Sequence, residues 1–254
     1  MTGAAGGMGA CFAAELARSG AAVVAGDTNA AGLRRLAARG RELDGELAVA
    51  KVDVTDEASV ADFTAEAVRR LGGVDALVNC AGIARDGELV RPEEGELKRL
   101  PLPQWRKVLE VNLTGQYLIT REVVAHMLEA GHPGVVVNIS SLARAGNPGQ
   151  SNYAASKAGL DACTRTWALE LAPHGIRVGG VAPGVTDTAF LEGFGDDARE
   201  RLRAQVPLGR LGRPEEIWQA VRFVIECDFF TGRTVEVDGG AAMGHAEGPG
   251  RVPS

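Results

Sequence analysis

Short apolar runs alternate with helical patterns along nearly the whole chain of 254 residues, and this alternation restricts the fold more than any other feature. The runs occupy 21–25, 47–52, 76–79, 135–140, 176–181 and 235–237. Runs this short and this apolar are typical of strands buried on both faces of a sheet. Strands that alternate with helices predict a doubly wound α/β fold with a mostly parallel sheet.

Apolar residues recur at helical spacing between these runs. Helices are expected through Phe12 and Leu16 to Gly20, over 30–39, from Thr55 onward, from Pro103 through Val124, around Tyr153 and from Pro214. Two stretches break the pattern: the charged segment 89–100 predicts a surface hairpin, and 186–206 predicts a mobile lid. We expect one domain over 1–240, followed by a flexible tail over 241–254.

A glycine-rich turn opens the chain without the strand that such a turn normally follows, because only Met1 stands before Thr2. The first strand of a doubly wound sheet lies in its middle, so its absence would leave two neighbouring strands without ladder partners. Each unpaired buried group costs about 1–3 kcal/mol, against a native stability of about 5–15 kcal/mol. We therefore expect that the natural start lies upstream of Met1; the alternative is a compromised fold.

The composition excludes several classes of protein. A net charge of −6 and a pI near 5.4 argue against nucleic-acid binding. No apolar run approaches the ~20 residues of a membrane-spanning helix, and the N-terminus lacks a secretion signal, so a cytoplasmic protein is expected. The four cysteines are widely spaced in apolar stretches, which favours reduced, buried thiols. Neither they nor the four histidines suggest a metal site.

The opening glycines suit a phosphate-binding loop. Gly3, Gly7, Met8 and Gly9 precede a helix, where small residues let a pyrophosphate approach the backbone and the helix N-terminus. Asp27 ends the next strand, where a carboxylate can accept hydrogen bonds from an adenosine ribose and repel a 2′-phosphate. No Arg or Lys follows directly to offset this charge, which favours NAD over NADP; alternatively, Asp27 caps the following helix.

Tyr153 and Lys157 stand four residues apart in the expected helix, one turn apart on one face. A cation about 4 Å from the phenol, at an effective dielectric of about 20, contributes about 4 kcal/mol. At about 1.36 kcal/mol per unit, this would lower the tyrosine pKa by about 3 units before desolvation offsets part of it. A phenol poised near neutrality is a good general acid/base, although such pairs are also common on solvated helices.

Taken together and in order, these motifs resemble the short-chain dehydrogenase/reductase family, from Thr2 to Gly240. The matching positions are Thr2-Gly3, Gly7, Gly9, Asp53-Val54, Asn79-Cys80-Ala81-Gly82, Asn112, Ser140-Ser141, Tyr153, Lys157 and Pro183-Gly184. The resemblance implies a Rossmann-type sheet, a bound nicotinamide dinucleotide and interconversion of secondary alcohols and ketones. The long 89–100 connection resembles a 3-oxoacyl reductase-like subgroup, which implies a 3-hydroxyacyl, 3-oxoacyl or other small hydroxy substrate.

The resemblance also implies roles. Tyr153 would be the general acid/base, Lys157 would lower its pKa and hold the nicotinamide ribose, and Asn112 would anchor a water in a proton relay. The other cofactor-binding positions it implies are Gly3, Gly7, Met8, Gly9, Asp27, Asp53, Val54, Asn79, Ala81, Gly82, Pro183, Gly184, Thr186 and Thr188. Association into homodimers or homotetramers through the two long helices is also implied.

The serine that polarises the substrate oxygen is ambiguous. The usual distance to the tyrosine selects Ser140, whereas the strand pattern selects Ser141. Neighbours on a strand face opposite ways, so only one can serve, and we expect Ser141.

Substrate selectivity is expected from Arg144, Gln150 and the stretch after Thr188. Gly179-Gly180 replaces the family's more usual Asn-Ala, which suggests a lost loop tether. The competing hypothesis is a nucleotide-binding or scaffold protein of the same fold without catalysis, because the first strand is absent.

Overall fold

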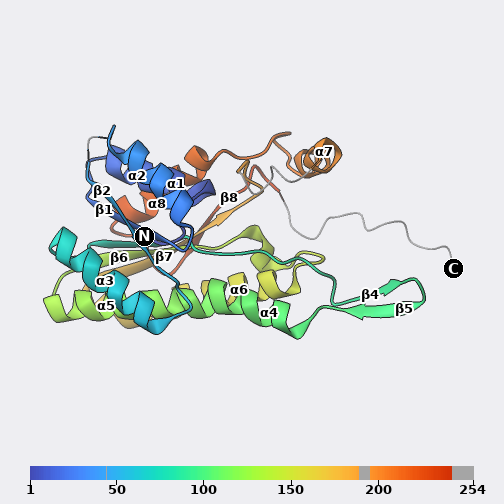
Figure 1. The fold of residues 1–254 in the computed structure, drawn as a ribbon, viewed down its shortest axis with the longest axis horizontal. Coiled ribbons are helices and arrows are strands. Elements are labelled where there is room, and N and C mark those ends of the chain that lie inside the picture. Colours follow the sequence, from blue (N-terminus) through green and yellow to red (C-terminus); the bar gives the residue numbers. More distant parts are fainter. Residues whose placement is uncertain (44, 189–194, 242–254) are drawn as a thin grey trace.

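Parallel strands form the middle layer of the molecule, as Figure 1 shows. The structure is a computed structural model that describes residues 1–43, 45–188 and 195–241. The strands are β1 (Val23–Asp27), β2 (Leu47–Lys51), β3 (Ala76–Asn79), β6 (Gly134–Ile139), β7 (Ile176–Pro183) and β8 (Thr234–Val237). They pair in parallel in the orders β1-β2 and β3-β6-β7-β8, which confirms the doubly wound α/β fold.

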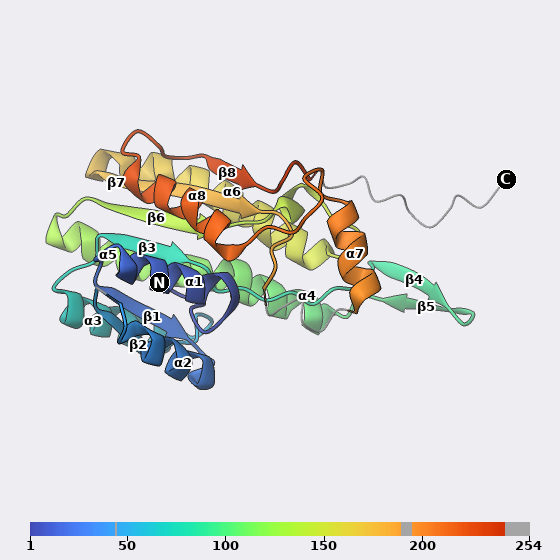
Figure 2. The same cartoon turned by 90° about the horizontal axis from the view of Figure 1, so that it is seen from above.

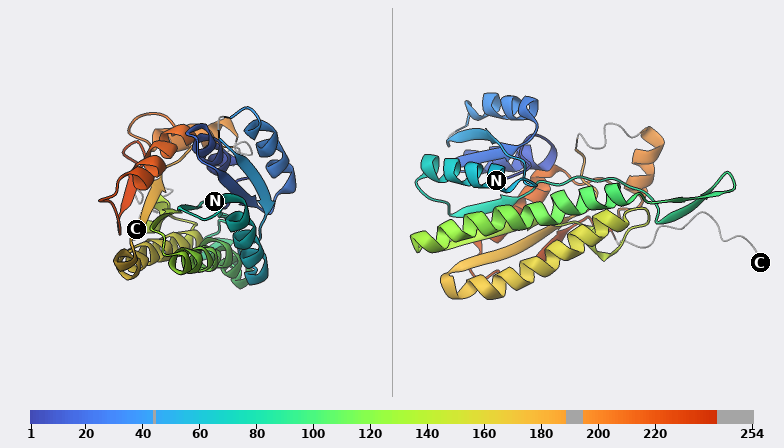
Figure 3. Two further views of the ribbon diagram at one scale, coloured as in Figure 1. Left: turned by 90° about the vertical axis from the view of Figure 1, so that its left-hand side faces the viewer. Right: turned by 60° about the horizontal axis from the view of Figure 1, so that its bottom comes forward.

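Helices cover both faces of the sheet (Figures 1 and 3). One face carries α1 (Gly7–Arg18), α2 (Ala30–Gly40) and α8 (Pro214–Glu226); the other carries α3 (Glu57–Leu71), α4 (Leu102–Leu109), α5 (Gly115–Ala130) and α6 (Ser151–Leu171). The α7 helix (Asp196–Ala204) lies beyond the carboxyl ends of the strands, as Figure 2 shows. Within the described residues, none of the helices combines the length and apolar character needed to cross a lipid bilayer.

Local signals set several helix ends. The Asp56 carboxylate accepts the backbone N–H groups of Ala58 and Ser59 at the start of α3, 2.9 and 3.2 Å away. That helix ends at Gly72, whose φ of +76° lies in the left-handed region. Pro214 begins α8, where a missing N–H removes no helical hydrogen bond.

A two-residue bridge, Met1–Thr2, joins β1 to β3 in place of a full central strand. Thr2 pairs in parallel with both Gly26 and Asn79, and its N–H donates to the Val78 carbonyl over 3.0 Å. The Met1 amine donates to the Val24 carbonyl over 2.8 Å, and burial lowers the pKa of this amine to about 5. Met1 and Thr2 therefore satisfy part of the two facing strand edges.

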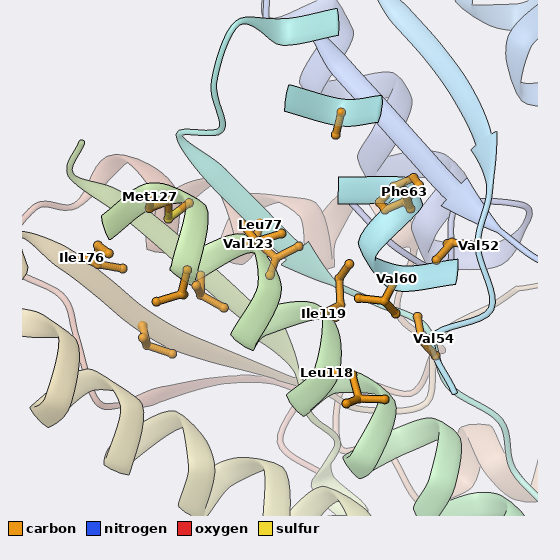
Figure 4. Close-up of a cluster of buried hydrophobic side chains, with 14 of the residues drawn as sticks. Val52, Val54, Val60, Phe63, Leu77, Leu118, Ile119, Val123, Met127 and Ile176 are labelled. Atoms are coloured by element: carbon orange, nitrogen blue, oxygen red, sulfur yellow. The ribbon is translucent and has the colours of Figure 1, made fainter. Parts of the chain in front are cut away.

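Three apolar clusters fill the space between the sheet and its helices in the described residues, and two of them are large. The first packs α3 and α5 against the sheet around fully buried residues such as Phe63, Ile119 and Met127 (Figure 4). The second lies under α1 and α8, where the Phe12 and Trp218 rings stand 6.3 Å apart. These clusters fix the sheet, and with it the positions of the loops at its carboxyl edge.

Two expectations about the middle of the chain need refinement. The segment 89–100 forms the predicted hairpin, with β4 (Val90–Glu93) antiparallel to β5 (Glu96–Arg99), and it projects away from the body (Figure 2). The long helix expected from Pro103 is instead α4 and α5 joined by a π-helical turn, Glu110–Thr114. Turns of this kind occur often at functional sites.

The remaining expectations, about the cysteines, the two unusual glycines, the lid and the tail, have different outcomes. All four cysteines are free, but only Cys11 is fully buried, whereas Cys80, Cys163 and Cys227 are partly exposed. The Gly180 position faces Thr234, and a side chain there would collide with that residue. Close packing of β7 against β8 therefore explains the second of the two unusual glycines. Residues 189–194 of the expected lid and 242–254 of the expected tail lie outside the described residues.

Candidate active site

A cleft of about 1070 Å³ opens at the carboxyl edge of the sheet, between the β1-β2 pair and the other strands. The strand order changes direction there, and ligands of open α/β sheets bind at such switch points. Most of the predicted positions line it: Gly3, Gly7, Met8, Gly9, Asp27, Asp53, Val54, Ala81, Gly82, Ser141, Tyr153, Lys157, Pro183, Gly184, Thr186 and Thr188. Asn79 and Asn112 do not.

The glycine-rich loop forms one wall of this cleft. Gly3 has a φ of +70°, and a Cβ there would lie 2.5 Å from the Ala81 nitrogen, so only glycine fits. A Cβ on Gly9 would collide with the Gly3 carbonyl. Gly6 caps α1 without a side-chain hydrogen bond, so the first backbone N–H groups of α1 are directed to the cleft, where they can bind an anion.

Two carboxylates stand along the same wall. The Asp27 oxygens accept the backbone N–H groups of Ala5 and Asn29, each over 2.9 Å. The Asp53 carboxylate accepts the hydroxyl and N–H of Thr55 over 2.7 and 3.0 Å, and these bonds lower its pKa.

Sequence reasoning missed two cations in this part of the cleft, Arg35 and Lys107. Both are exposed helical residues. Neither follows Asp27 or Asp53 closely in the chain, so their approach depends on how α2 and α4 pack.

The side chains of the adjacent residues Ser140 and Ser141 point in opposite directions, as expected at the end of a strand. The Ser141 hydroxyl accepts the Ala143 N–H over 3.1 Å, and it lies close enough to the Tyr153 phenol to lower the pKa of that phenol in part. The buried Ser140 hydroxyl instead points to the Lys157 carbonyl of α6, 3.5 Å away. The geometry therefore favours Ser141 as the partner of Tyr153.

Lys157 is 4% exposed, and its ammonium donates to the Ile139 carbonyl over 2.7 Å. Burial lowers the pKa of this amine to about 8. The ammonium lies 5.7 Å from the centre of the Tyr153 ring. The two side chains therefore share one face of α6, as their spacing predicts.

The expected depression of the Tyr153 pKa is not found. Burial is the largest influence and raises the pKa of the phenol, with negative charge on Cys80 and Asp86 as lesser causes in the same direction. The ammonium of Lys157 is held by the Ile139 carbonyl rather than by the phenolic oxygen. The sequence argument assumed a separation of about 4 Å and gave desolvation too little weight.

Asn112 lies in the π-helical turn and is fully buried. Its amide binds both backbone polar groups of Ile83, over 2.8 and 2.9 Å, and donates to the Ser156 hydroxyl over 3.2 Å. This pairing fixes the loop after β3 against α6, next to Tyr153. The water-anchoring role of Asn112 stays a prediction.

Asn79 is placed differently from the expectation that it lines the adenosine side. Its buried amide donates to the Thr120 hydroxyl and to the side-chain oxygen Oδ1 of Asn138, over 2.7 and 2.9 Å. Asn138 in turn donates to Thr164 over 2.8 Å. The residue therefore joins α5 and α6 through the sheet.

Arg144 does not line the cleft, so the expectation that it selects substrates is wrong. Its guanidinium forms ion pairs with Asp161 of α6 and Glu236 of β8, and Asp161 also accepts the Thr234 hydroxyl over 3.0 Å. These ion pairs connect the short helix Leu142–Ala145 to α6 and β8.

Replacing Arg144 with Met should lower the free energy of unfolding by about 1–2 kcal/mol, because the Asp161 carboxylate would lose its charged partner in a partly buried place. Chemical denaturation measures the change. Arg203→Met is the matched control, since Arg203 pairs with Glu200 at an exposed i,i+3 site, and the change should alter stability by less than about 0.5 kcal/mol. Equal losses in the two variants would contradict this assignment.

The outer end of the cleft has a polar rim that the sequence only partly indicated. Gln150 was expected near the substrate and does line the cleft, but Asp86 had no sequence signal. The Gln150 amide donates to both Asp86 oxygens, each over 3.1 Å, and accepts from Asn147 over 2.8 Å. The backbones of Gly87 and Gln150 also pair as a bridge.

Comparisons with known proteins agree with this geometry. A family model described as Enoyl-(Acyl carrier protein) reductase matches residues 3–242. The chain is 40% identical over 246 residues to 3-oxoacyl-[acyl-carrier-protein] reductase FabG of Thermotoga maritima, covering 96% of both chains. It is 41% identical over 243 residues to cis-4-hydroxycyclohexanecarboxylate dehydrogenase of Sinomonas cyclohexanicum, covering 94% of both.

A solved structure is also similar. A short-chain type dehydrogenase/reductase from Mycobacterium marinum matches with a TM-score of 0.87 at 28% identity, over 94% of this chain and 93% of that one. The matches span the glycine-rich loop, the serine, the tyrosine and the lysine. The chain belongs to the short-chain dehydrogenase/reductase family, in its 3-oxoacyl reductase-like group.

Proposed function

We propose that this protein is an NAD(H)-dependent oxidoreductase that interconverts a secondary alcohol and a ketone, with Tyr153 as general acid/base. The observation that carries the proposal is the convergence of Ser141, Tyr153 and Lys157 in the same cleft as the glycine-rich loop. A dinucleotide needs such a cleft, because its phosphates and its reactive ring lie far apart.

The residues present fit a nicotinamide dinucleotide. Gly3 and Gly9 let the loop turn tightly, because a Cβ on either would collide with backbone atoms, and the uncapped α1 N-terminus supplies donors for a pyrophosphate. Asp27 would hold the adenosine ribose, and Asp53 with Val54 the adenine. Pro183, Gly184, Thr186 and Thr188 would border the nicotinamide. When bound, this cofactor would donate or accept a hydride.

The chain's own residues would handle the substrate oxygen and its proton. Ser141 would donate a hydrogen bond to that oxygen and so keep it near the phenol. Tyr153 would give its proton to the oxygen in ketone reduction and take it back in alcohol oxidation. The raised pKa of the phenol keeps Tyr153 protonated at neutral pH, which suits the donor role. Lys157 would hold the ribose next to it.

An activity screen with paired alcohols and ketones tests the proposal. Secondary alcohols, 3-hydroxyacyl thioesters and the matching ketones should be offered with NAD, NADP and their reduced forms, and absorbance at the nicotinamide band followed. Turnover of at least one pair is expected. Binding of NADH without turnover of any pair would support the rival hypothesis, a nucleotide-binding protein of this fold without catalysis.

Asp27 should determine the preference for NAD. We expect Asp27→Asn to raise the ratio of kcat/KM with NADPH to that with NADH by about tenfold or more, because the variant removes a charge facing the 2′-phosphate. Arg35→Gln is the counterpart, since Arg35 is the cation that could bind that phosphate. A wild type that prefers NADPH, and loses that preference in Arg35→Gln, would contradict the choice of NAD.

The partner and the place of action rest on the family resemblance alone. We infer a homodimer or homotetramer in the cytoplasm, acting on a small-molecule substrate. Light scattering of the purified protein tests the oligomeric state.

A further inference from the structure

The geometry points to Asp86 as a specificity-determining residue that disfavours anionic substrates and so selects neutral acyl derivatives over free carboxylates. This inference rests on the proposed function, because it concerns the substrate end of the same cleft. It goes beyond that function by naming the residue and the charge class it selects.

Asp86 is held in place at the mouth of the cleft. It lies on the loop that follows β3, and the Gln150 amide donates to both of its oxygens, each over 3.1 Å. Asn147 fixes the other end of that amide over 2.8 Å, and the Gly87 N–H donates to the Gly149 carbonyl over 2.7 Å. A carboxylate restrained in this way presents its charge at a constant place.

The charge of Asp86 reaches the reacting end of the cleft. Cys80 and Asp86 are the two groups whose negative charge raises the pKa of Tyr153. Burial raises the pKa of the Cys80 thiol to about 11, so this thiol is neutral at pH 7. Of these two groups, Asp86 is therefore the one that carries a negative charge near the phenol under ordinary conditions.

The neighbouring cation is not among the groups that shift the pKa of Tyr153. Arg85 also lines the cleft, but its side chain is exposed and donates to the carbonyl of its own neighbour Ala84 over 3.3 Å. Arg144, which the sequence suggested for substrate selectivity, is held by Asp161 and Glu236 and does not line the cleft. A substrate carboxylate a few bonds from the reacting carbon would thus meet a carboxylate that Gln150 holds in place, beside an arginine that no side-chain partner holds among the described residues.

A pair of probes that differ only in charge measures the selection. Oxidation of methyl 3-hydroxybutanoate and of 3-hydroxybutanoate is followed at pH 7 for the wild type and for Asp86→Asn, which keeps an acceptor oxygen for Gln150. We expect the wild type to favour the ester, and the variant to raise the carboxylate-to-ester ratio of kcat/KM about fivefold, since the carboxylate is solvent-exposed and partly screened. Glu88→Gln is the matched control, because Glu88 is an exposed acid two residues away that does not line the cleft.

The carboxylate-to-ester ratios of the two variants decide whether Asp86 selects against anionic substrates. A ratio that shifts in Asp86→Asn and stays constant in Glu88→Gln supports the inference. A ratio that is unchanged in Asp86→Asn, or that shifts equally in both variants, overturns it, and so does an equal fall for both probes, which would indicate a positioning role. If the wild type binds NADH but oxidises neither these probes nor any alcohol of the wider screen, the proposed function itself fails, and the inference fails with it.

Discussion

Replacing Tyr153 with Phe should reduce kcat for ketone reduction by about 10²–10⁴-fold while the affinity for NADH stays unchanged. The phenolic hydroxyl is the group in the cleft that stands beside Ser141 with a transferable proton, and general acid catalysis contributes a factor of this size. The substitution removes one oxygen and leaves the ring that packs beneath Lys157. Cofactor binding rests mainly on the glycine-rich loop and Asp27, so it should be retained.

The chain offers a close control for this experiment, because it contains only two tyrosines. Tyr117 lies on α5, is 44% exposed and stacks under Arg121. Tyr117→Phe should keep wild-type kcat. Steady-state kinetics and NADH fluorescence titration should be run on both variants, with circular dichroism to confirm folding. Full activity in Tyr153→Phe would remove the catalytic assignment, whereas loss of NADH binding would show that the phenol supports the cofactor instead.

The sheet could be predicted from the sequence because its signals are local. Buried parallel strands must be short apolar runs, and each of the six expected runs overlaps a strand of the structure. The start of α8 could also be predicted from the sequence, because Pro214 suits the first turn of a helix. The break between α4 and α5 was not, because the π-helical turn at Asn112 depends on contacts with Ile83, which is 29 residues away in the chain.

The candidate site was predictable as far as backbone geometry determines it. The glycine cradle, the choice of Ser141 and the shared face of Tyr153 and Lys157 follow from turn, strand and helix periodicity. Charges were not predictable in the same way. Arg144 was expected at the cleft and lies outside it, whereas Asp86 lines the cleft without any sequence signal, because their partners, Asp161, Glu236 and Gln150, come from distant elements.

Lys157→Met should abolish most turnover and at the same time stabilise the cofactor-free protein at pH 7 by about 1–2 kcal/mol. Burial lowers the pKa of Lys157 to about 8, whereas an unfolded lysine has a value of about 10.4. The folded state thus binds this proton more weakly than the unfolded state, so the charge opposes folding. At about 1.36 kcal/mol per unit the penalty is at most about 3 kcal/mol, and the loss of the bond to the Ile139 carbonyl offsets part of the gain.

The dependence on pH distinguishes this explanation from ordinary repacking. The penalty is fully present below pH 8 and disappears as the pH rises from about 8 to about 10.4, where the wild-type amine is neutral in both states. The stability advantage of Lys157→Met, measured by chemical denaturation, should therefore shrink over that window. Lys107→Met removes a charge from the same cleft at an exposed position and should show no such trend. A Lys157→Met variant less stable than the wild type at pH 7 would mean that the ammonium's bond to Ile139 outweighs its desolvation, and the lysine would then be a structural support as well as a functional group.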